Sequence, residues 1–363
     1  MVSSESLGFR LTVLNPGGTD REQSFLDGAG ESGREHAPVN FHAFAACTGG
    51  SFQRETARAI AQNTPVLLLL RGDFRAAQRA LVALKKSKRT VAVSLKETGL
   101  HQIAQQLRDP AKLFRFQNIV AAADACIATT EEAADVYRSF RAPANDENVA
   151  FIPTPYPVGD TRWDFSRAPN ERTGIFVGTR EWKVPTRNHL AALLLARALS
   201  EISNASVTVF NGDGRRGAKL LGMLKFRPNR LRVLEKRLAY PDYLREVGRH
   251  RIVLQLDTSC VPGQVAGDAL LCRMPCVGGN GAVDRIAFSD TCGFGRSISE
   301  IKEIAMRLLT DDVFCEQTIL TSQARAKKQI GFETIAKQLR DFFQRLGTGS
   351  PVPQREEEER ASK

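Results

Sequence analysis

The stretch that decides the fold is Ile175-Phe-Val-Gly-Thr-Arg-Glu-Trp-Lys183, in which three apolar residues precede a glycine and two cations. A short apolar run that ends at a glycine is typical of a buried strand running into a turn. The glycine, Gly178, permits close approach of a ligand to the backbone. Arg180 and Lys183 suit a diphosphate, because arginine donates two parallel hydrogen bonds to phosphate and lysine acts as a point charge.

Two further loops of the same half have a related composition. Residues 211–214, Asn-Gly-Asp-Gly, follow an apolar run and form a turn that exposes backbone near a ligand. Residues 262–268, Pro-Gly-Gln-Val-Ala-Gly-Asp, open a helix whose free N–H groups suit phosphate, while Asp268 accepts hydrogen bonds from sugar hydroxyls. Each loop alone also has a simpler interpretation, as an ordinary turn or helix cap. The order and spacing of all three loops indicate one ligand site at the carboxyl ends of strands.

Short apolar runs alternate with helical stretches along the whole chain, which indicates an α/β protein with two Rossmann-like, doubly wound domains. The helix expected at residues 186–202 presents Leu190, Leu193, Leu194 and Ala198 on one face. Strands are expected at residues 9–14, 39–44, 65–70, 90–95, 125–128, 149–152, 174–177, 207–210, 231–234, 252–256 and 275–277. Helices are expected at residues 74–86, 131–140, 186–202, 240–247, 266–271, 298–310 and 332–346.

A proline-rich break after residue 152 divides the chain into two predicted domains. The first comprises residues 1–158 and is expected to bind the acceptor of a transfer reaction, and residues 159–171 are a linker. The second comprises residues 172–331 and is expected to bind a donor. Residues 332–346 are predicted to be a crossover helix, and residues 347–363, rich in Gly, Ser, Pro and Glu, a disordered tail.

Residues 174–290 resemble the C-terminal domain of the GT-B glycosyltransferases, closest to the large retaining class called family 4. The segment at 175–183 is similar to the family's strand, glycine, Arg and Lys diphosphate motif. Residues 239–244, Ala-Tyr-Pro-Asp-Tyr-Leu, resemble the stretch before the donor loop. Residues 268–278, Asp-Ala-Leu-Leu-Cys-Arg-Met-Pro-Cys-Val-Gly, are similar to the family's Glu-Ala-Met-x-x-Gly-x-Pro-Val-Val block. The resemblance covers about a third of the chain and implies two domains facing across a cleft.

The resemblance also implies a set of donor-site residues. Arg180 and Lys183 would bind the donor diphosphate, and Asp268 would hold the ribose in place of the usual Glu. Two departures stand out: the family's first Glu falls on Cys260, and Arg180 lies one residue later than in the commonest pattern. Asp257 is a candidate substitute for the missing carboxylate. The other donor-binding residues would be Gly178, Thr179, Asn211, Gly212, Gly263, Val265 and Ala266.

The first half offers fewer candidates for the acceptor side of the cleft. The turn that contains Gly17 and Gly18 resembles the glycine-rich first loop of such domains, at the rim of the cleft. His101, shortly after Glu97-Thr98-Gly99, is a candidate for contacting the transferred sugar or the acceptor. A single histidine is more often a structural or surface group, and this interpretation of His101 stays open.

The function implied by the resemblance is that of a retaining, hexosyltransferase-like enzyme of glycan biosynthesis. It would transfer a sugar from a nucleotide-diphosphate donor to a glycan or lipid-linked acceptor, without a metal and without a cofactor. Two alternatives remain open. A GT-B sugar-nucleotide epimerase would need acid and base carboxylates in the cleft, and a non-catalytic nucleotide-sugar binder is suggested by Cys260.

Composition bounds the partners and the location. The net charge of +11 admits anionic partners, but four Tyr, two Trp and no reader motif argue against nucleic acid. The seven scattered cysteines fit reduced, mostly buried thiols, and no signal peptide is recognised, so a cytoplasmic protein is expected. Residues 71–89 combine an apolar stripe of Phe74, Ala77, Leu81 and Leu84 with basic residues, which include Arg75, Arg79, Lys85, Lys86, Lys88 and Arg89. This segment indicates either peripheral contact with the inner membrane face or, as we favour, packing on the first sheet.

Overall fold

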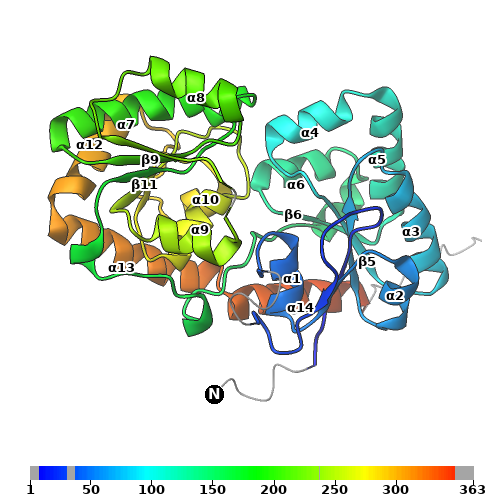
Figure 1. Ribbon diagram of the computed structural model, residues 1–363. Helices are drawn as coiled ribbons and strands as arrows, with labels where there is room; N and C mark the ends of the chain where they lie inside the picture. Colours follow the sequence, from blue (N-terminus) through cyan, green and yellow to red (C-terminus); the bar gives the residue numbers. More distant parts are fainter. Residues whose placement is uncertain (1–7, 31–36, 237, 348–363) are drawn as a thin grey trace, which may run out of the picture.

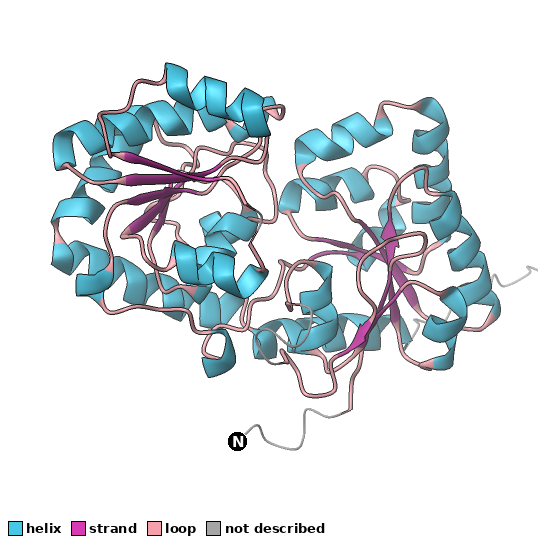
Figure 2. Cartoon of the chain, viewed as in Figure 1, coloured by secondary structure: helices cyan, strands magenta, loops and turns pink. Residues whose placement is uncertain are grey.

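The computed structural model describes residues 8–30, 37–236 and 238–347 of the chain. They form two lobes, each with a mostly parallel sheet between layers of helices (Figures 1 and 2). The N-terminal lobe holds a sheet of order β2-β3-β1-β4-β5-β6-β7, and the C-terminal lobe one of order β10-β9-β8-β11-β12. Each sheet has a buried apolar cluster on either face. This architecture confirms the predicted fold class of two doubly wound α/β domains.

The strands are short and, except for β2, pair in parallel. All five residues of β4 are buried, as expected for a parallel strand covered on both faces. The strands of the N-terminal lobe are β1 Thr12–Leu14, β2 Gln23–Ser24, β3 Ser51–Gln53, β4 Val66–Leu70, β5 Val91–Leu95, β6 Ala125–Ala128 and β7 Val149–Phe151. Those of the C-terminal lobe are β8 Ile175–Val177, β9 Val207–Phe210, β10 Leu231–Leu234, β11 Ile252–Leu254 and β12 Cys276–Val277.

Helices connect the strands and cover the sheets. The α-helices that precede β8 are α1 Phe41–Cys47, α2 Thr56–Ala61, α3 Arg75–Lys86, α4 Leu100–Leu107, α5 Pro110–Ala122 and α6 Glu131–Arg138. Those that follow are α7 His189–Ser203, α8 Gly214–Met223, α9 Tyr240–Val247, α10 Gln264–Leu271, α11 Ala282–Ala287, α12 Ile298–Thr310, α13 Asp312–Gln329 and α14 Phe332–Gly347. The described residues also form the short 3₁₀ turns η2 Pro143–Asn148, η3 Thr161–Trp163, η4 Pro169–Glu171 and η5 Pro185–Arg187.

The strand expected at residues 39–44 is wrong, because this segment begins helix α1. Its sequence, Phe-His-Ala-Phe-Ala-Ala-Cys, contains three alanines, which favour a helix. The first six residues of α1 are all buried, so the segment lacks the polar positions that distinguish the two periodicities. β1 pairs with β4 on one side and with β3 on the other, and β3 is a strand that the sequence did not indicate.

Helix α7 forms where the sequence predicts it but buries a different face. Leu190 and Leu194 are 51% and 43% exposed, and the buried stripe is formed by Ala192, Leu193, Leu195, Ala196 and Leu199. Both stripes of α7 are apolar, so the spacing of its leucines does not select between them. The contacts of α7 with β8, β9 and α12 make the selection.

The last helix returns to the first lobe. In Figure 1, α14 lies under the N-terminal lobe beside α1, far along the chain from the strands that it covers. Its residues Ile335, Leu339, Phe342 and Phe343 are buried in one cluster with residues of β1, β3 and β4. The domain boundaries predicted from the sequence stay a prediction, which limited proteolysis would test.

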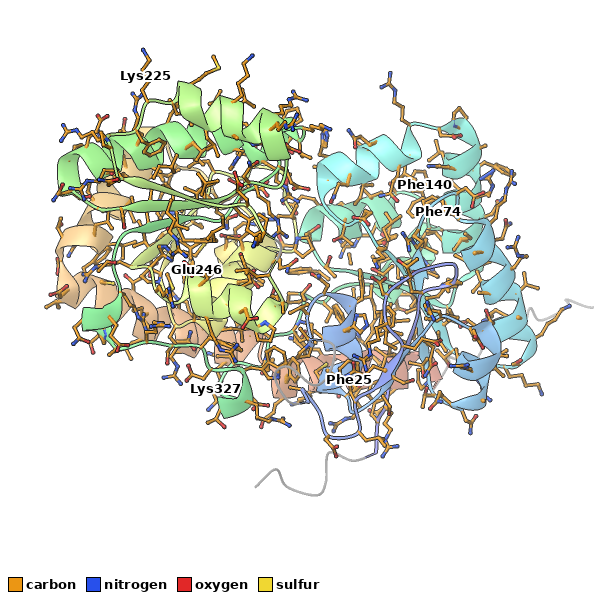
Figure 3. All side chains as sticks on the ribbon, viewed as in Figure 1. Phe25, Phe74, Phe140, Lys225, Glu246 and Lys327 are labelled. Carbon is orange, nitrogen blue, oxygen red and sulfur yellow. The ribbon has the colours of Figure 1, made fainter. Side chains whose placement is uncertain are left out.

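Helix α3 packs against the first sheet through the stripe noted in the sequence. Phe74, Ala77, Leu81 and Leu84 are buried in the cluster that also contains Phe116 of α5. Figure 3 shows Phe74 and Phe140 inside the helical layer of this lobe, and Phe116 packs between them with ring centroids 6.3 and 5.5 Å away. This packing accounts for the apolar stripe without a membrane. No helix of residues 8–30, 37–236 and 238–347 is long and apolar enough to span a bilayer.

All seven cysteines are free thiols, as the sequence predicts. Five of them are buried, and only Cys47 and Cys260 are partly exposed.

Candidate functional site

A cavity of about 620 Å³ lies between the two lobes, where the carboxyl ends of strands from both sheets meet. The N-terminal lobe contributes Asp20 and the loop that follows β5. The C-terminal lobe contributes the loops after β8 and β11 and the start of α10. This is the place where doubly wound folds bind ligands, because loops and free helix N-termini converge there.

The loop after β8 brings Gly178, Thr179 and Arg180 to the cavity. A side chain at Gly178 would place Cβ 2.3 Å from Val265, so only glycine lets this loop pack against the start of α10. The Thr179 hydroxyl is 3.0 Å from Nδ1 of His189, which fixes the loop to the first residue of α7. The guanidinium of Arg180 lies over the ring of Phe210, 5.8 Å from its centroid, and both residues line the cavity.

The second cation of this wall is Arg187, which the sequence analysis did not single out. Lys183 is exposed and does not line the cavity, whereas Arg187 does. The guanidinium of Arg187 forms ion pairs with Glu181, at 2.8 Å, and with Asp257. Burial opposes its charge, but the two carboxylates raise the pKa of Arg187 above its ordinary value. Its place directly before α7 was the one available signal, since side chains at helix starts after a strand face the ligand edge.

The carboxylate of Asp257 is already bound to Arg187 and Ser259 within this wall. It is 2% exposed, pairs with Arg187, and accepts hydrogen bonds from the backbone N–H of Ser259, at 2.8 Å, and from the Ser259 hydroxyl. The carboxylate considered as a substitute for the Glu missing at Cys260 therefore lines the cavity but is already paired.

The start of α10 forms the floor of the cavity. Gly263 caps the helix with φ 94°, a conformation that favours glycine. It lines the cavity together with Gln264 and Val265, so N–H groups of the first turn lie near the ligand space. Ala266 is fully buried behind this edge and does not line the cavity.

Asp268 lies one turn into α10, among tyrosines. It is 3% exposed, lines the cavity, and accepts a hydrogen bond of 2.6 Å from the Tyr240 hydroxyl. Burial raises the pKa of Asp268 to about 7, although the Tyr240 hydrogen bond and the charge of Arg180 oppose this rise. The hydrogen bonds from Tyr240 and Tyr243 and the charge of Arg180 thus stabilise the ionised form of the Asp268 carboxyl group against burial.

Asn211 and Gly212 lie next to the cavity rather than on its surface. The Asn211 side chain donates to the carbonyl of Gly214, at 2.9 Å, and accepts from the N–H of Asp213, at 3.1 Å. These bonds fix the turn between β9 and α8, and it is the preceding residue, Phe210, that lines the cavity.

The turn that contains Gly17 and Gly18 helps to position Asp20, which lines the cavity. Gly17 and Gly18 do not line the cavity, but a Cβ at Gly18 would collide with Asn15, whose amide donates to Asp20 at 2.6 Å. Asp20 forms an ion pair with Lys96, and both line the cavity. Burial would raise the pKa of Asp20, but the hydrogen bond and charge of Lys96 prevail and lower it.

His101 lies in the first turn of α4 and does not line the cavity, whereas its neighbour Gln102 does. The start of α4 touches the other lobe instead: the N–H of Leu100 donates to the Ser259 carbonyl at 3.1 Å. Glu132 of α6 and Arg285 of α11 add an ion pair between the lobes at 2.8 Å.

Cys260 lies beside this ion pair and outside the cavity lining, with φ 48° and its sulfur 3.7 Å from Nδ2 of Asn280. Burial, followed by the charge of Glu132, raises the pKa of the Cys260 thiol, which opposes its ionisation.

Comparison with solved structures places this fold. No protein-family model and no curated protein sequence matches the chain. Anabaena HepE in complex with UDP has 12% sequence identity and a TM-score of 0.62, over 93% of this chain and 100% of that one. Sucrose-phosphate synthase from Thermosynechococcus elongatus has 15% identity and a TM-score of 0.61, over 94% and 100%. A UDP-forming trehalose-phosphate synthase from Burkholderia xenovorans has 9% identity and a TM-score of 0.59, over 94% and 100%. The chain therefore has the GT-B fold, two Rossmann-like domains facing across a cleft.

Proposed function

We propose that the protein is a glycosyltransferase that takes its sugar from a nucleotide-diphosphate donor bound in the cleft. The observation that carries the proposal is the wall on which Arg180, Arg187 and the N-terminus of α10 line one cavity. Two guanidinium groups and free backbone N–H groups are the groups that bind a diphosphate. Structures of HepE with UDP and with UDP-glucose support the proposal, since that protein shares this fold.

The cations also define the chemical role of this wall. A departing nucleotide diphosphate gains negative charge as its bond to the sugar breaks, and fixed cations stabilise that charge in the transition state. Transfer without a metal is part of the proposal, because Arg180 supplies positive charge at this wall, whereas the charge of Arg187 is shared with Glu181 and Asp257. We propose a glycan or lipid-linked acceptor and a cytoplasmic setting, as the family resemblance and the sequence imply.

Retention of the anomeric configuration is implied only by the resemblance to family 4. The position of the family's first Glu is Cys260, which lies outside the cavity lining.

The donor site is tested by calorimetry with nucleoside diphosphates. Hydrogen bonds to charged groups contribute about 1.5–3 kcal/mol, so Arg180→Ala should weaken UDP binding by roughly tenfold to 150-fold. Lys183→Ala is the matched control, because it removes a cation of the same loop that does not line the cavity. Thermal-shift screening of UDP, GDP and dTDP with their sugars should identify the donor. Equal UDP affinity for wild type and a folded Arg180→Ala variant would show that the site is misplaced.

A further inference from the structure

The loop after β5 presents an acidic side chain to the cavity from the N-terminal lobe. Glu97 is exposed and lines the cavity, on the wall that faces Arg180 and Arg187. Its backbone is held on both sides: the N–H of Lys96 donates to the Leu70 carbonyl at 2.9 Å, and Gln106 donates to the Glu97 carbonyl at 3.2 Å. Three residues on, Leu100 bonds to Ser259 of the other lobe. The backbone of Glu97 is thus fixed, and the residue is exposed where it lines the cavity.

The other acidic residues of the cavity are already engaged. Asp20 pairs with Lys96, Glu181 and Asp257 share Arg187, and Asp268 accepts from Tyr240. Glu97 differs from them. Among the residues that the structure describes, no hydrogen bond or ion pair engages its carboxylate. A general base needs free oxygen lone pairs within reach of the hydroxyl that it deprotonates, and Glu97 is the one of these five acidic residues whose two carboxylate oxygens both lack a partner among the described residues.

We propose that Glu97 is the general base of the transfer, an assignment that rests on the proposed function. Glu97 takes the proton of the acceptor hydroxyl while its oxygen bonds to the anomeric carbon of the donor sugar. The bond from that carbon to the diphosphate breaks, and its electron pair leaves on the diphosphate beside Arg180 and Arg187. The protonated carboxyl then returns its proton to solvent.

The proposed base and the cations belong to different lobes. Glu97 belongs to the N-terminal lobe and the two arginines to the C-terminal lobe, so a sugar held between them would meet its nucleophile on the face opposite the leaving group. Displacement from the opposite face inverts the anomeric centre, as it does when a carboxylate activates water in inverting glycosidases. This outcome departs from the retention that the family resemblance implies.

Comparing two nucleophiles, water and azide, distinguishes a role of Glu97 as general base from a role in binding alone. Water must lose a proton when it attacks UDP-glucose, whereas azide attacks as an anion and needs no base. Glu97→Gln should slow hydrolysis of UDP-glucose by about 10²–10⁴-fold, and leave transfer to azide within about threefold of wild type. Proton NMR should show β-glucosyl azide from the α-linked donor. The matched control is Glu303→Gln on α12, an exposed carboxylate outside the cavity lining, which should leave both rates unchanged.

The assignment is overturned if Glu97→Gln hydrolyses UDP-glucose at the wild-type rate, if it loses both reactions equally while UDP affinity is kept, or if the product is the α-azide. Calorimetry with UDP on each variant shows that the donor site is intact. Failure of the wild type to bind UDP, GDP or dTDP and their sugars would instead count against the proposed function itself.

Discussion

At the scale of single residues, two buried acids link stability to pH. Burial raises the pKa of Asp268 to about 7, and burial together with the charge of Asp257 does the same for Asp284. Their ordinary value is 3.8, so the folded state holds these protons more tightly than the unfolded state does. The stability that they contribute is present below pH 3.8 and is lost as the pH rises through about 7.

We therefore expect the free energy of unfolding to fall between pH 5 and pH 8, and to fall less in Asp268→Asn. One pKa unit corresponds to about 1.4 kcal/mol, so the contribution of Asp268 is bounded at roughly 4 kcal/mol. Urea denaturation at the two pH values measures the difference. Asp146→Asn, at an exposed position, is the control. A pH dependence identical in wild type and Asp268→Asn would show that this carboxyl is ionised in the folded protein.

At the scale of elements, helix α10 depends on close contact with the chain that joins the lobes. Gly267 faces Tyr156, which is 1% exposed, and a Cβ at this glycine would lie 1.9 Å from the ring. The absence of a side chain at Gly267 thus lets α10 approach Tyr156 closely enough to bring its N-terminus to the cleft.

Gly267→Ala should destabilise the protein by roughly 1–3 kcal/mol, because the added methyl group forces Tyr156 or the helix to move. Gly222 of α8 is the matched control, since a Cβ there meets nothing within 4 Å. Gly222→Ala should stabilise by about 0.5–1 kcal/mol through helix propensity. Urea denaturation of both variants compares the signs directly, and a neutral Gly267→Ala would mean that α10 has room to shift.

At the scale of the whole molecule, helix α14 from the end of the chain packs against the N-terminal lobe. Leu339 is fully buried in one cluster with residues of β1 and β4, which both lie within the first 70 residues of the chain. The stability of the N-terminal sheet therefore depends on α14, the last of the described helices to be synthesised.

Leu339→Ala should cost about 2–5 kcal/mol, as expected for truncating a buried leucine. Hydrogen exchange should show the loss of protection in β1 and β4, whereas β8 and β11, which are nearer in sequence, should keep theirs. Leu320→Ala on α13 is the control, since that side chain is 58% exposed. Uniform loss of protection in both sheets would show that the lobes unfold as one unit.

The sequence by itself determined the architecture and one cation of the cleft. A short apolar run such as residues 66–70, followed by turn residues, is enough to predict a strand in the middle of a sheet. A strand that is covered on both faces must be apolar throughout, so its own sequence reveals its burial. The order of strand, Gly178 and Arg180 likewise needs only local spacing, and Arg180 does line the cavity.

Only the tertiary structure decided which side chains share the cleft. Arg187 rather than Lys183 lines it, and Arg187 lies in the 3₁₀ turn at 185–187 directly before α7. The buried face of α7 and the helix at 41–47 depended on neighbours far along the chain, since their own sequences are apolar on several sides. The carboxylate of Glu97 differs from those of Asp20, Glu181, Asp257 and Asp268 by having no partner among the described residues. Whether a carboxylate is free or paired is a property of the folded arrangement, because its partners come from other strands and the other lobe.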